Sequence, residues 1–190
     1  MTVYEPSDDT YLLLSSLPEN LAGKSVLDVG CGNGLLSEAA ANRGAHVLAT
    51  DISVAATKAT RERCEKLRAG SCDVIVADLL CELNKKAKFD LILFNPPYLP
   101  ADAPNSSEWT GGRHGWELGI RFVHSALPHL KKEGSILLLL SSASGKGWMN
   151  AMPKTTSWKI LKRKRLFFET LFVVSVRAVS ESASMPQEQS

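Results

Sequence analysis

Residues Val26–Gly34 read VLDVGCGNG, and this stretch decides the fold class of the 190-residue chain. A buried strand, Ser25–Val29, is expected to run directly into Gly30, Gly32 and Gly34, with a helix after them. Glycines at such a turn let the backbone bend sharply and approach a ligand closely. The spacing is G-x-G-x-G, not the G-x-G-x-x-G of dinucleotide-binding folds, and no Lys-Ser/Thr pair follows as in a phosphate-binding loop. A tight strand-to-helix turn without a ligand is the alternative interpretation.

Outward from this turn, short apolar runs alternate with amphipathic segments. Further strands are expected at Ala45–Thr50, Asp73–Ala77, Phe89–Phe94, Ser135–Leu140, Trp158–Leu161 and Leu171–Val179, the last two as a hairpin-like pair. Helices are expected from a Ser7 cap through Tyr11–Leu14, and at Leu35–Arg43, Ser53–Arg68 and Trp116–Lys132, with Gly134 ending the last. Strands that alternate with helices indicate parallel pairing through right-handed crossovers. We therefore predict one domain with a doubly wound, mostly parallel seven-stranded α/β sheet of Rossmann-like type, which binds its ligand at the carboxyl ends of the strands.

The composition fits an ordinary globular domain. The net charge of +2 is too small to indicate a nucleic-acid partner by itself. The four cysteines lack C-x-x-C spacing and a histidine pair, so we expect free thiols, no disulfide and no metal. We expect no signal peptide and no membrane span, and a cytoplasmic location, with the nucleus as a second compartment. The domain should cover residues 1–179, with a disordered tail at 180–190.

Three aspartates stand at the ends of three successive predicted strands. Asp28 lies where its strand enters the turn, so either a cationic amino group of a ligand or a structural salt bridge should compensate its charge. Asp51 stands where a carboxylate can accept hydrogen bonds from two ribose hydroxyls, although it could instead cap the helix that Ser53 already caps. Asp78 could accept from an adenine amino group while Leu79 covers the ring. Together the three aspartates favour a ligand that contains a nucleoside.

The most specific motif is Asn95-Pro96-Pro97-Tyr98, directly after the predicted strand Phe89–Phe94. Two prolines fix the backbone and remove two donors, so nearby carbonyls stay free to accept hydrogen bonds. The carbonyls of Asn95 and Pro96 could then accept the two hydrogens of a substrate NH₂ group, and Tyr98 offers a flat face for stacking. A proline turn that only closes the strand is the alternative, but it gives the asparagine and the tyrosine no role.

In combination, G-x-G-x-G with Asp28, then Asp51, Asp78 and N-P-P-Y resemble the class I S-adenosylmethionine-dependent methyltransferases that modify exocyclic or amide nitrogens. The segments VYEPSDDTYLLL at Val3–Leu14 and WTGGRHG at Trp109–Gly115 look like the HemK-type branch of eukaryotes and archaea, the release-factor glutamine methyltransferases. N-P-P-Y alone also occurs in adenine and guanine methyltransferases. The two flanking segments are what narrow the resemblance.

The resemblance covers roughly residues 3–179 and implies roles for the matching positions. It implies cofactor contacts from Thr10, Asp28, Gly30, Gly32, Asp51, Ile52, Asp78, Leu79 and Asn95. It implies that Asn95, Pro96 and Tyr98 orient the acceptor amide, with further substrate contacts from Pro97, Trp109 and Arg113. The implied reaction moves the methyl group of S-adenosylmethionine to the side-chain amide of a glutamine in the GGQ motif of a translation release factor. The stretch between Tyr98 and Trp109 is short and departs from the pattern of the family.

Other activities stay open at this point. A nucleic-acid methyltransferase that acts on an adenine or guanine amine would use the same kind of stacking pocket. A protein lysine methyltransferase and a cofactor-binding scaffold without activity are further alternatives. A planar NH₂ group fits the two acceptors of N-P-P-Y better than a lysine amine does.

Two segments are expected to contact partners. The strand Asp73–Ala77 should lie at a sheet edge, and an exposed apolar edge invites pairing with another chain. The resemblance implies a heterodimer with a small zinc-binding activator subunit through this edge, whereas shielding by Cys64–Ser71 is the alternative. Leu99–Gly115 is expected to be a working loop, or else a floppy surface loop. The basic run Lys162–Arg165 is expected to be a solvated face, with contact to ribosomal RNA or to an acidic protein surface as the alternative.

Overall fold

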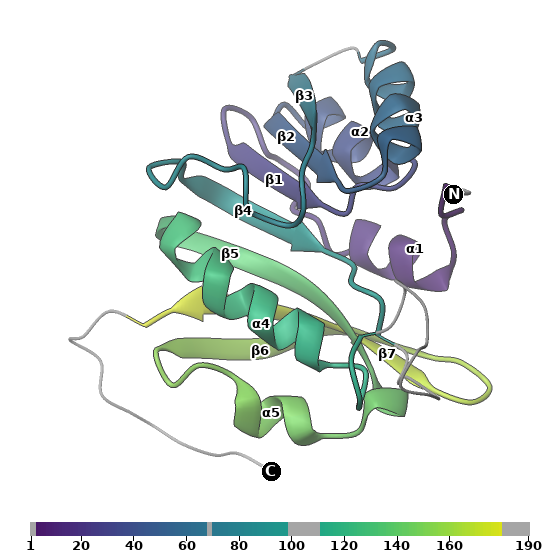
Figure 1. Ribbon diagram of the computed structural model, residues 1–190, viewed down its shortest axis with the longest axis vertical. Helices are drawn as coiled ribbons and strands as arrows, with labels where there is room; N and C mark the ends of the chain where they lie inside the picture. The colour runs from purple at the N-terminus through teal and green to yellow at the C-terminus, as the bar shows by residue number, and fades with distance from the viewer. Residues whose placement is uncertain (1–2, 68–69, 99–110, 180–190) are drawn as a thin grey trace.

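Seven strands form one sheet in the order β3-β2-β1-β4-β5-β7-β6, and the structure, a computed structural model, describes residues 3–67, 70–98 and 111–179 (Figure 1). The strands are β1 (Ser25–Val29), β2 (His46–Asp51), β3 (Ser71–Val76), β4 (Phe89–Phe94), β5 (Leu130–Ser141), β6 (Thr156–Arg165) and β7 (Thr170–Ala178). Neighbouring strands are parallel except that β7 runs antiparallel to β5 and β6. This arrangement confirms the predicted doubly wound, mostly parallel α/β sheet.

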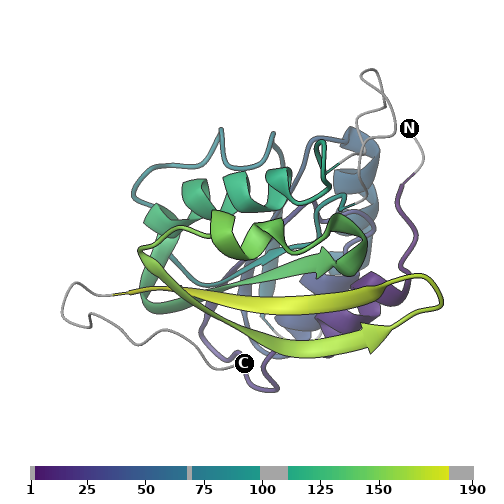
Figure 2. The ribbon, with the colours of Figure 1, turned by 90° about the horizontal axis from the view of Figure 1, so that it is seen from below.

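Helices cover both faces of the sheet, with α1 on one side and α4 and α5 on the other (Figure 2). The helices are α1 (Asp8–Leu14), α2 (Leu35–Asn42), α3 (Val54–Cys64), α4 (Glu117–Ala126) and α5 (Gly147–Ala151), with 3₁₀ turns η1 (Leu127–His129) and η2 (Ser142–Ser144). Alternate residues of β1 enter opposite cores: Val26 packs in the core with α1 and α2, and Leu27 in the core with α4 and α5. Because both faces are covered, the central strands are nearly continuous apolar runs.

The order of the strands reverses between β1 and β4, which places two functional segments together. The chain runs outward from β1 to β2 and β3, and β4 then returns to the other side of β1. Asp28 and Val29 lie opposite Leu93 and Phe94 in parallel register. The glycine turn after β1 and the Asn95–Tyr98 segment after β4 therefore leave the sheet side by side. Such a switch point is where open α/β sheets bind ligands.

The predicted strands Ser25–Val29 and Phe89–Phe94 match β1 and β4 residue for residue, but the predicted helix Trp116–Lys132 is too long at its C-terminal end. Helix α4 ends at Ala126, and Pro128 stands in the 3₁₀ turn η1 that follows. Proline has no N–H group with which to continue an α-helix. The residues after η1 already belong to β5, which also contains the glycine that was expected to end the helix.

The hairpin-like pair predicted near the end of the sequence is confirmed as β6 and β7. Strand β6 is longer than expected and contains the basic run Lys162–Arg165, so the predicted solvated face is only partly correct. Lys162 Nζ donates to the Ser15 carbonyl, and Lys164 Nζ forms an ion pair with Asp8 Oδ1 at 2.7 Å. Half of the basic run therefore ties the outer strand to α1.

No helix in the described ranges is both long enough and apolar enough to cross a membrane. The predicted tail at 180–190 and most of the predicted loop Leu99–Gly115 lie outside these ranges. The described end of that loop is joined to α4, because the Leu118 amide donates to the Gly111 carbonyl at 3.0 Å.

Candidate active site

A cavity of about 1000 Å³ lies at the carboxyl ends of β1, β2, β3 and β4. Its volume suits a ligand of nucleoside size or larger. The predicted residues that line it are Thr10, Gly30, Gly32, Asp51, Ile52, Asp78, Leu79, Asn95, Pro96, Pro97 and Tyr98. Residues that are far apart in the sequence thus meet around one space.

The glycine turn after β1 has a backbone that other residues rarely adopt. The φ angle is +65° at Gly30, +54° at Gly32 and +81° at Gly34. A Cβ on Gly34 would also lie 2.8 Å from the Cα of Thr60, so this glycine allows α2 to begin directly against α3. Gly30 and Gly32 line the cavity, where the bare backbone can approach a ligand closely.

Asp51 ends β2 and is held by the backbone around it. Its Oδ2 accepts from the Gly32 amide at 3.0 Å, and its Oδ1 accepts from the Ser53 amide at 2.8 Å. The Ser53 side chain caps α3, as predicted, by accepting from the Ala56 amide at 3.3 Å. Each carboxylate oxygen can accept a second hydrogen bond. Asp51 is therefore fixed in place and can still accept from two hydroxyl groups at the cavity wall.

Asp28 is buried near the turn and is not among the residues that line the cavity. Its Oδ2 accepts from the Ser37 hydroxyl at 2.5 Å. No cationic side chain pairs with it among the described residues, so the structural salt bridge considered as its alternative partner is absent there. Burial raises the pKa of Asp28 to about 7, although the Ser37 hydrogen bond opposes the shift. The protein thus leaves this carboxyl group without a compensating charge.

The ends of β2 and β3 supply apolar and acidic side chains to the cavity. Ile52 lines the cavity and is 68% exposed. Leu79 is the one non-glycine residue with a positive φ, 53°, in the described part of the chain, a strained conformation of the kind found at ligand sites. The side chain of Asp78 is exposed, while its amide donates to Glu82 Oε2 at 3.1 Å. Such a rim suits a flat heterocycle that carries an amino group.

Asn95 follows β4 and has one unpaired oxygen. Its Oδ1 is buried and has no hydrogen-bond partner in the part of the chain that the structure describes. A buried acceptor without a donor is costly unless a ligand supplies one. The side chain of Asn95 also lowers the pKa of Asp9, an effect that requires the amide NH₂ group of Asn95 to point to the ionised carboxylate. The asparagine is therefore anchored at its nitrogen and leaves its oxygen available.

Asp9 also lines the cavity but is not among the predicted site residues, because an acidic side chain in the first turn of a helix has an ordinary local role. The carboxylate is buried and accepts from the Tyr4 hydroxyl and from the Ser7 hydroxyl, each at 2.7 Å. It also accepts from Thr10 Oγ1 at 3.1 Å. Burial by itself raises the pKa of Asp9, but the hydrogen bonds from Tyr4, Ser7, Thr10 and Asn95 outweigh it and lower the pKa. Asp9 is therefore ionised, and it joins several side chains at the cavity wall by hydrogen bonds.

Tyr98 is fixed from both sides. Its hydroxyl lies 3.5 Å from Asp9 Oδ2, and its carbonyl accepts from the Ser144 hydroxyl at 2.6 Å. Burial is the main cause that raises the pKa of Tyr98, and the nearby Asp9 carboxylate adds to it, so the phenol stays neutral. No described residue donates to the Pro96 carbonyl. The segment thus keeps an open acceptor between a fixed asparagine and a fixed tyrosine.

Several further cavity residues were not predicted. They are Val3, Tyr4, Leu36, Phe94, Glu117, Leu118 and Arg121, among others. The predicted substrate contact Arg113 is exposed and does not line the cavity, and Trp109 lies outside the described residues. No group of three or more His, Cys, Asp or Glu side chains in the described ranges could hold a metal ion.

The edge position predicted for Asp73–Ala77 is correct, because β3 is the outermost strand on its side of the sheet. One outward carbonyl, that of Val74, accepts from the Arg61 guanidinium at 3.0 Å. The side chain of Val76 is 49% exposed. Helix α3 thus covers part of this edge and leaves the end near Val76 open.

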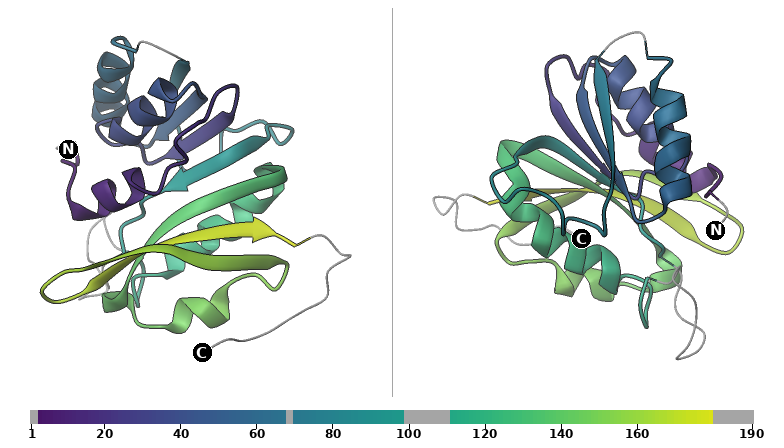
Figure 3. Two further views of the ribbon diagram at one scale, coloured as in Figure 1. Left: turned by 180° about the vertical axis from the view of Figure 1, so that it is seen from behind. Right: turned by 45° about the horizontal axis from the view of Figure 1, so that its top comes forward.

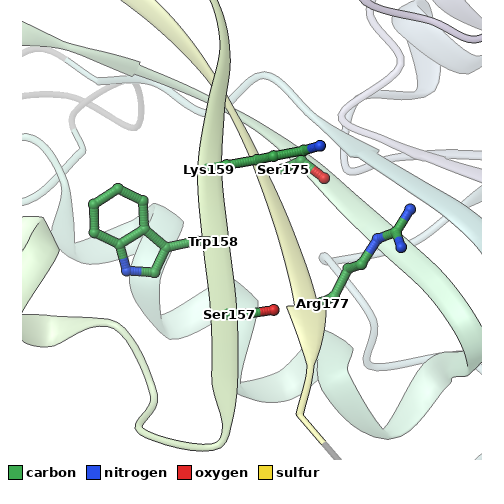
Figure 4. Close-up of a pocket in the computed structure, with 5 residues that line it drawn as sticks. All are labelled: Ser157, Trp158, Lys159, Ser175 and Arg177. Carbon is green, nitrogen blue, oxygen red and sulfur yellow. The ribbon is translucent and has the colours of Figure 1, made fainter. Parts of the chain in front are cut away.

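A second, smaller hollow of about 260 Å³ lies on β6 and β7 (Figure 4). Lys159 and Arg177 project from one side of the two strands, whereas Trp158 projects from the other. The hollow lies where β6 begins and β7 ends, at the opposite end of the sheet from the glycine turn. It brings together none of the motif residues.

Comparison with known proteins agrees with this geometry. The model of the family described as "Methyltransferase small domain" matches residues 5–155. A Methanocaldococcus jannaschii protein with the name "Putative protein N5-glutamine methyltransferase" is 37% identical over 182 residues, which cover 91% of this chain and 90% of that protein. Methyltransferase HEMK2 of Mus musculus is 36% identical over 154 residues, 72% of this chain and 71% of the mouse protein.

A solved structure is also similar. The structure of the E. cuniculi Mtq2–Trm112 complex, described as responsible for the methylation of the eRF1 translation termination factor, matches with a TM-score of 0.72 and 31% identity. The match covers 94% of this chain and 99% of the matched chain. With its strand order, its cavity and these relatives, the chain belongs to the methyltransferase small domain family and is a class I S-adenosylmethionine-dependent methyltransferase of the HEMK2/Mtq2 type.

Proposed function

We propose that this enzyme methylates the side-chain amide nitrogen of a glutamine, and that the glutamine lies in the GGQ motif of a translation release factor. The observation that carries the proposal is the buried, unpaired Oδ1 of Asn95, whose amide nitrogen is anchored by Asp9. An acceptor held in this way is open to a donor from a ligand. A planar primary amide supplies such a donor.

The residues of the cavity fit S-adenosylmethionine. Asp51 would accept from the two ribose hydroxyls, and Gly30 and Gly32 would lie against the ligand through bare backbone. Ile52 and Leu79 would cover the adenine, with Asp78 accepting from its amino group. Asp28 would compensate the positive amino group through the turn, and Thr10 and Asn95 would contact the reactive end of the cofactor. When bound, S-adenosylmethionine supplies a methyl group activated by a sulfonium.

The residues of the chain would then prepare the acceptor. An amide nitrogen is a poor nucleophile because its lone pair is delocalised into the carbonyl. Asn95 Oδ1 and the Pro96 carbonyl would accept its two hydrogens and increase the electron density on nitrogen, while Tyr98 and Pro97 hold the plane of the amide. These residues would place the amide nitrogen in line with the activated methyl group, so that an N–C bond could form as the methyl–sulfur bond breaks. The nitrogen then releases one proton to solvent, so no strong general base is needed.

The choice of a release factor rests on similarity. The E. cuniculi complex is described as acting on eRF1, and the M. jannaschii relative is named for glutamine methylation. The same complex pairs Mtq2 with a second protein, Trm112, which supports a partner subunit for this chain. We infer that this partner is the small zinc-binding activator implied by the resemblance, and that it would pair with the open edge at Asp73–Ala77.

The direct test incubates the enzyme with labelled S-adenosylmethionine and a release factor, with and without the activator. Parallel reactions contain the release factor with its GGQ glutamine replaced by alanine, and bulk RNA and DNA. We expect the methyl label on the intact release factor alone. Label that persists in the alanine variant would move the acceptor to another residue, such as a lysine. Label on nucleic acid would instead support the amine methyltransferase.

A further inference from the structure

The turn that joins β6 to β7 carries two highly exposed aromatic side chains. Phe167 and Phe168 are 93% and 92% exposed, and their rings lie edge to face with centroids 4.7 Å apart. Single exposed apolar side chains are common on proteins, but two adjacent exposed aromatic rings form the kind of patch that marks an interaction site.

Local structure does not explain these phenylalanines. The turn is tight, because Arg165 pairs with Thr170 and the Leu166 amide donates to the Glu169 carbonyl at 2.7 Å. Tight hairpin turns favour glycine, asparagine and aspartate at their central positions. Large aromatic side chains at those positions add nothing to the turn itself. Their contribution must come from something that covers them.

The turn lies at the same end of the sheet as residues Asn95–Tyr98, which we call the acceptor segment. β7 begins opposite the end of β5, and the turn projects beyond the sheet on the side of α1 (Figures 1 and 3). Glu169 accepts a hydrogen bond from Ser141 at the end of β5, and it is close enough for its charge to act on Tyr98. The Tyr98 carbonyl is in turn bound by Ser144 of η2, which directly follows β5. The turn that carries the two exposed rings is therefore connected, through Glu169 and the residues at the end of β5, to Tyr98, which is proposed to hold the acceptor amide.

The strand before the turn adds positive charge. Arg163 and Arg165 alternate with Lys162 and Lys164, so they lie on the other face of β6. The lysine side chains bind α1 and its C-terminal end, whereas neither arginine side chain has a hydrogen bond or an ion pair in the described part of the chain. A free guanidinium is well suited to bind a carboxylate with two parallel hydrogen bonds. We call Arg163, Arg165, Phe167 and Phe168 the hairpin surface.

We propose that the hairpin surface docks the protein substrate. It would bind a segment of the substrate that has apolar side chains flanked by carboxylates and that lies outside the substrate loop containing the acceptor glutamine. This inference rests on the proposed function. A glutamine side chain offers few contacts, so an enzyme that selects one glutamine must bind more of the protein that carries it. A second contact on the same protein raises the effective concentration of the acceptor at the cavity. The position beside the acceptor segment favours the substrate protein over a lipid surface or an RNA, neither of which needs to lie there.

The test compares an intact release factor with a short peptide that contains its GGQ glutamine, with the activator present in every reaction. One variant combines Phe167→Ser with Phe168→Ser, and a second combines Arg163→Gln with Arg165→Gln. The control combines Lys85→Gln with Lys86→Gln, which removes two exposed charges at the opposite end of the sheet. Each hairpin variant should raise KM for the intact protein about tenfold or more. Their kcat, their kinetics on the peptide and their thermal midpoints should match those of the control.

Two results would overturn the docking site, and a third would overturn the proposed function as well. An unchanged KM for the intact protein in both hairpin variants overturns the docking site, whether or not the variants lose binding to lipid vesicles or RNA. An equal loss on the peptide also overturns it, because the residues would then act on the cavity. If the wild-type enzyme methylates no release factor, the proposed function fails first and the docking site fails with it.

Discussion

The hydroxyl of Tyr98 lies 3.5 Å from Asp9 Oδ2, although 89 residues separate the two in the chain. Asp9 lies in the first turn of α1, and Tyr98 follows β4. The same carboxylate also holds Asn95. The N-terminal segment thus does more than cover one side of the sheet, because it fixes the two side chains proposed to hold the acceptor.

Replacing Asp9 should therefore impair catalysis more than cofactor binding. In Asp9→Asn, an amide NH₂ group would face donors such as the Tyr4 hydroxyl, so the network would reorganise and Asn95 would lose its fixed orientation. A shift of the acceptor site by an ångström lowers kcat about 10²-fold. The matched control is Asp8→Asn, whose exposed carboxylate only pairs with Lys164. Steady-state kinetics in which both variants behave alike would remove Asp9 from the mechanism.

Asn95→Ala removes the unpaired acceptor itself. We expect turnover to fall about 10²–10³-fold or more, as for the loss of one preorganised group at a reacting centre. The dissociation constant of S-adenosylmethionine, measured by calorimetry, should change much less, because most of the predicted cofactor contacts lie elsewhere in the cavity. Turnover close to that of the wild type would refute the role of Asn95.

The sheet could largely be predicted because its central strands are covered on both faces and appear as apolar runs. The end of α4 could not, since apolar residues continue through Leu130 and the effect of Pro128 is easily underestimated. Helix α5 has only five residues and no clear periodicity. Its buried Trp148 packs on Trp158 of β6 with centroids 5.0 Å apart, a tertiary contact that leaves no local signal.

The pKa of Asp28 predicts opposite pH effects on stability and on cofactor affinity. The folded state keeps a proton up to about pH 7 that the unfolded state loses near the ordinary value of 3.8. The contribution of Asp28 to stability is thus present at low pH and is lost as the pH rises through this window. A cationic ligand needs the charged form, so affinity should be about tenfold weaker at about pH 6 than at about pH 8. Calorimetry at both pH values checks this.

The matched variant for that measurement is Asp28→Asn, which cannot titrate. Its affinity for S-adenosylmethionine should be weaker than that of the wild type and nearly constant over the same pH range. A wild-type affinity that does not change with pH would show that Asp28 makes no use of its charge.

Gly34→Ala should destabilise the fold by about 2–4 kcal/mol, through an unfavourable φ together with overpacking. The added Cβ would meet the backbone of Thr60 at 2.8 Å. Gly23→Ala is the control, since its φ is +69° but its Cβ would enter open space. It should lose only about 1–2 kcal/mol. Urea unfolding of both variants gives the comparison, and equal losses would mean that the contact between α2 and α3 tolerates the methyl group.

A charge at the open edge of β3 should prevent assembly with the activator. Val76→Asp places a carboxylate where the partner strand would approach, and charged residues disfavour pairing at such an edge. The control Leu161→Asp changes a similarly exposed apolar residue on β6, the opposite edge strand. We expect only the Val76 variant to lose co-purification with the activator, while both retain their thermal midpoints. Co-purification of both variants would place the interface elsewhere.

The candidate site was predictable where each residue directly follows a strand. Asp51, Asp78 and Asn95 stand at the ends of parallel strands, and these ends meet at one edge of the sheet. Asp9 was not predictable in this way, because an acidic residue in the first turn of a helix has an ordinary local explanation. Its partners Asn95 and Tyr98 follow β4, far from Asp9 in the sequence, and only the folded chain brings them together.

The most direct measurement is a crystal structure of the enzyme with S-adenosylhomocysteine and a peptide that contains the acceptor glutamine. We expect the glutamine amide nitrogen within about 2.7–3.2 Å of both Asn95 Oδ1 and the Pro96 carbonyl oxygen, with the plane of the amide against Tyr98. A peptide amide bound elsewhere, or an Asn95 Oδ1 already paired with a group of the enzyme itself, would contradict it.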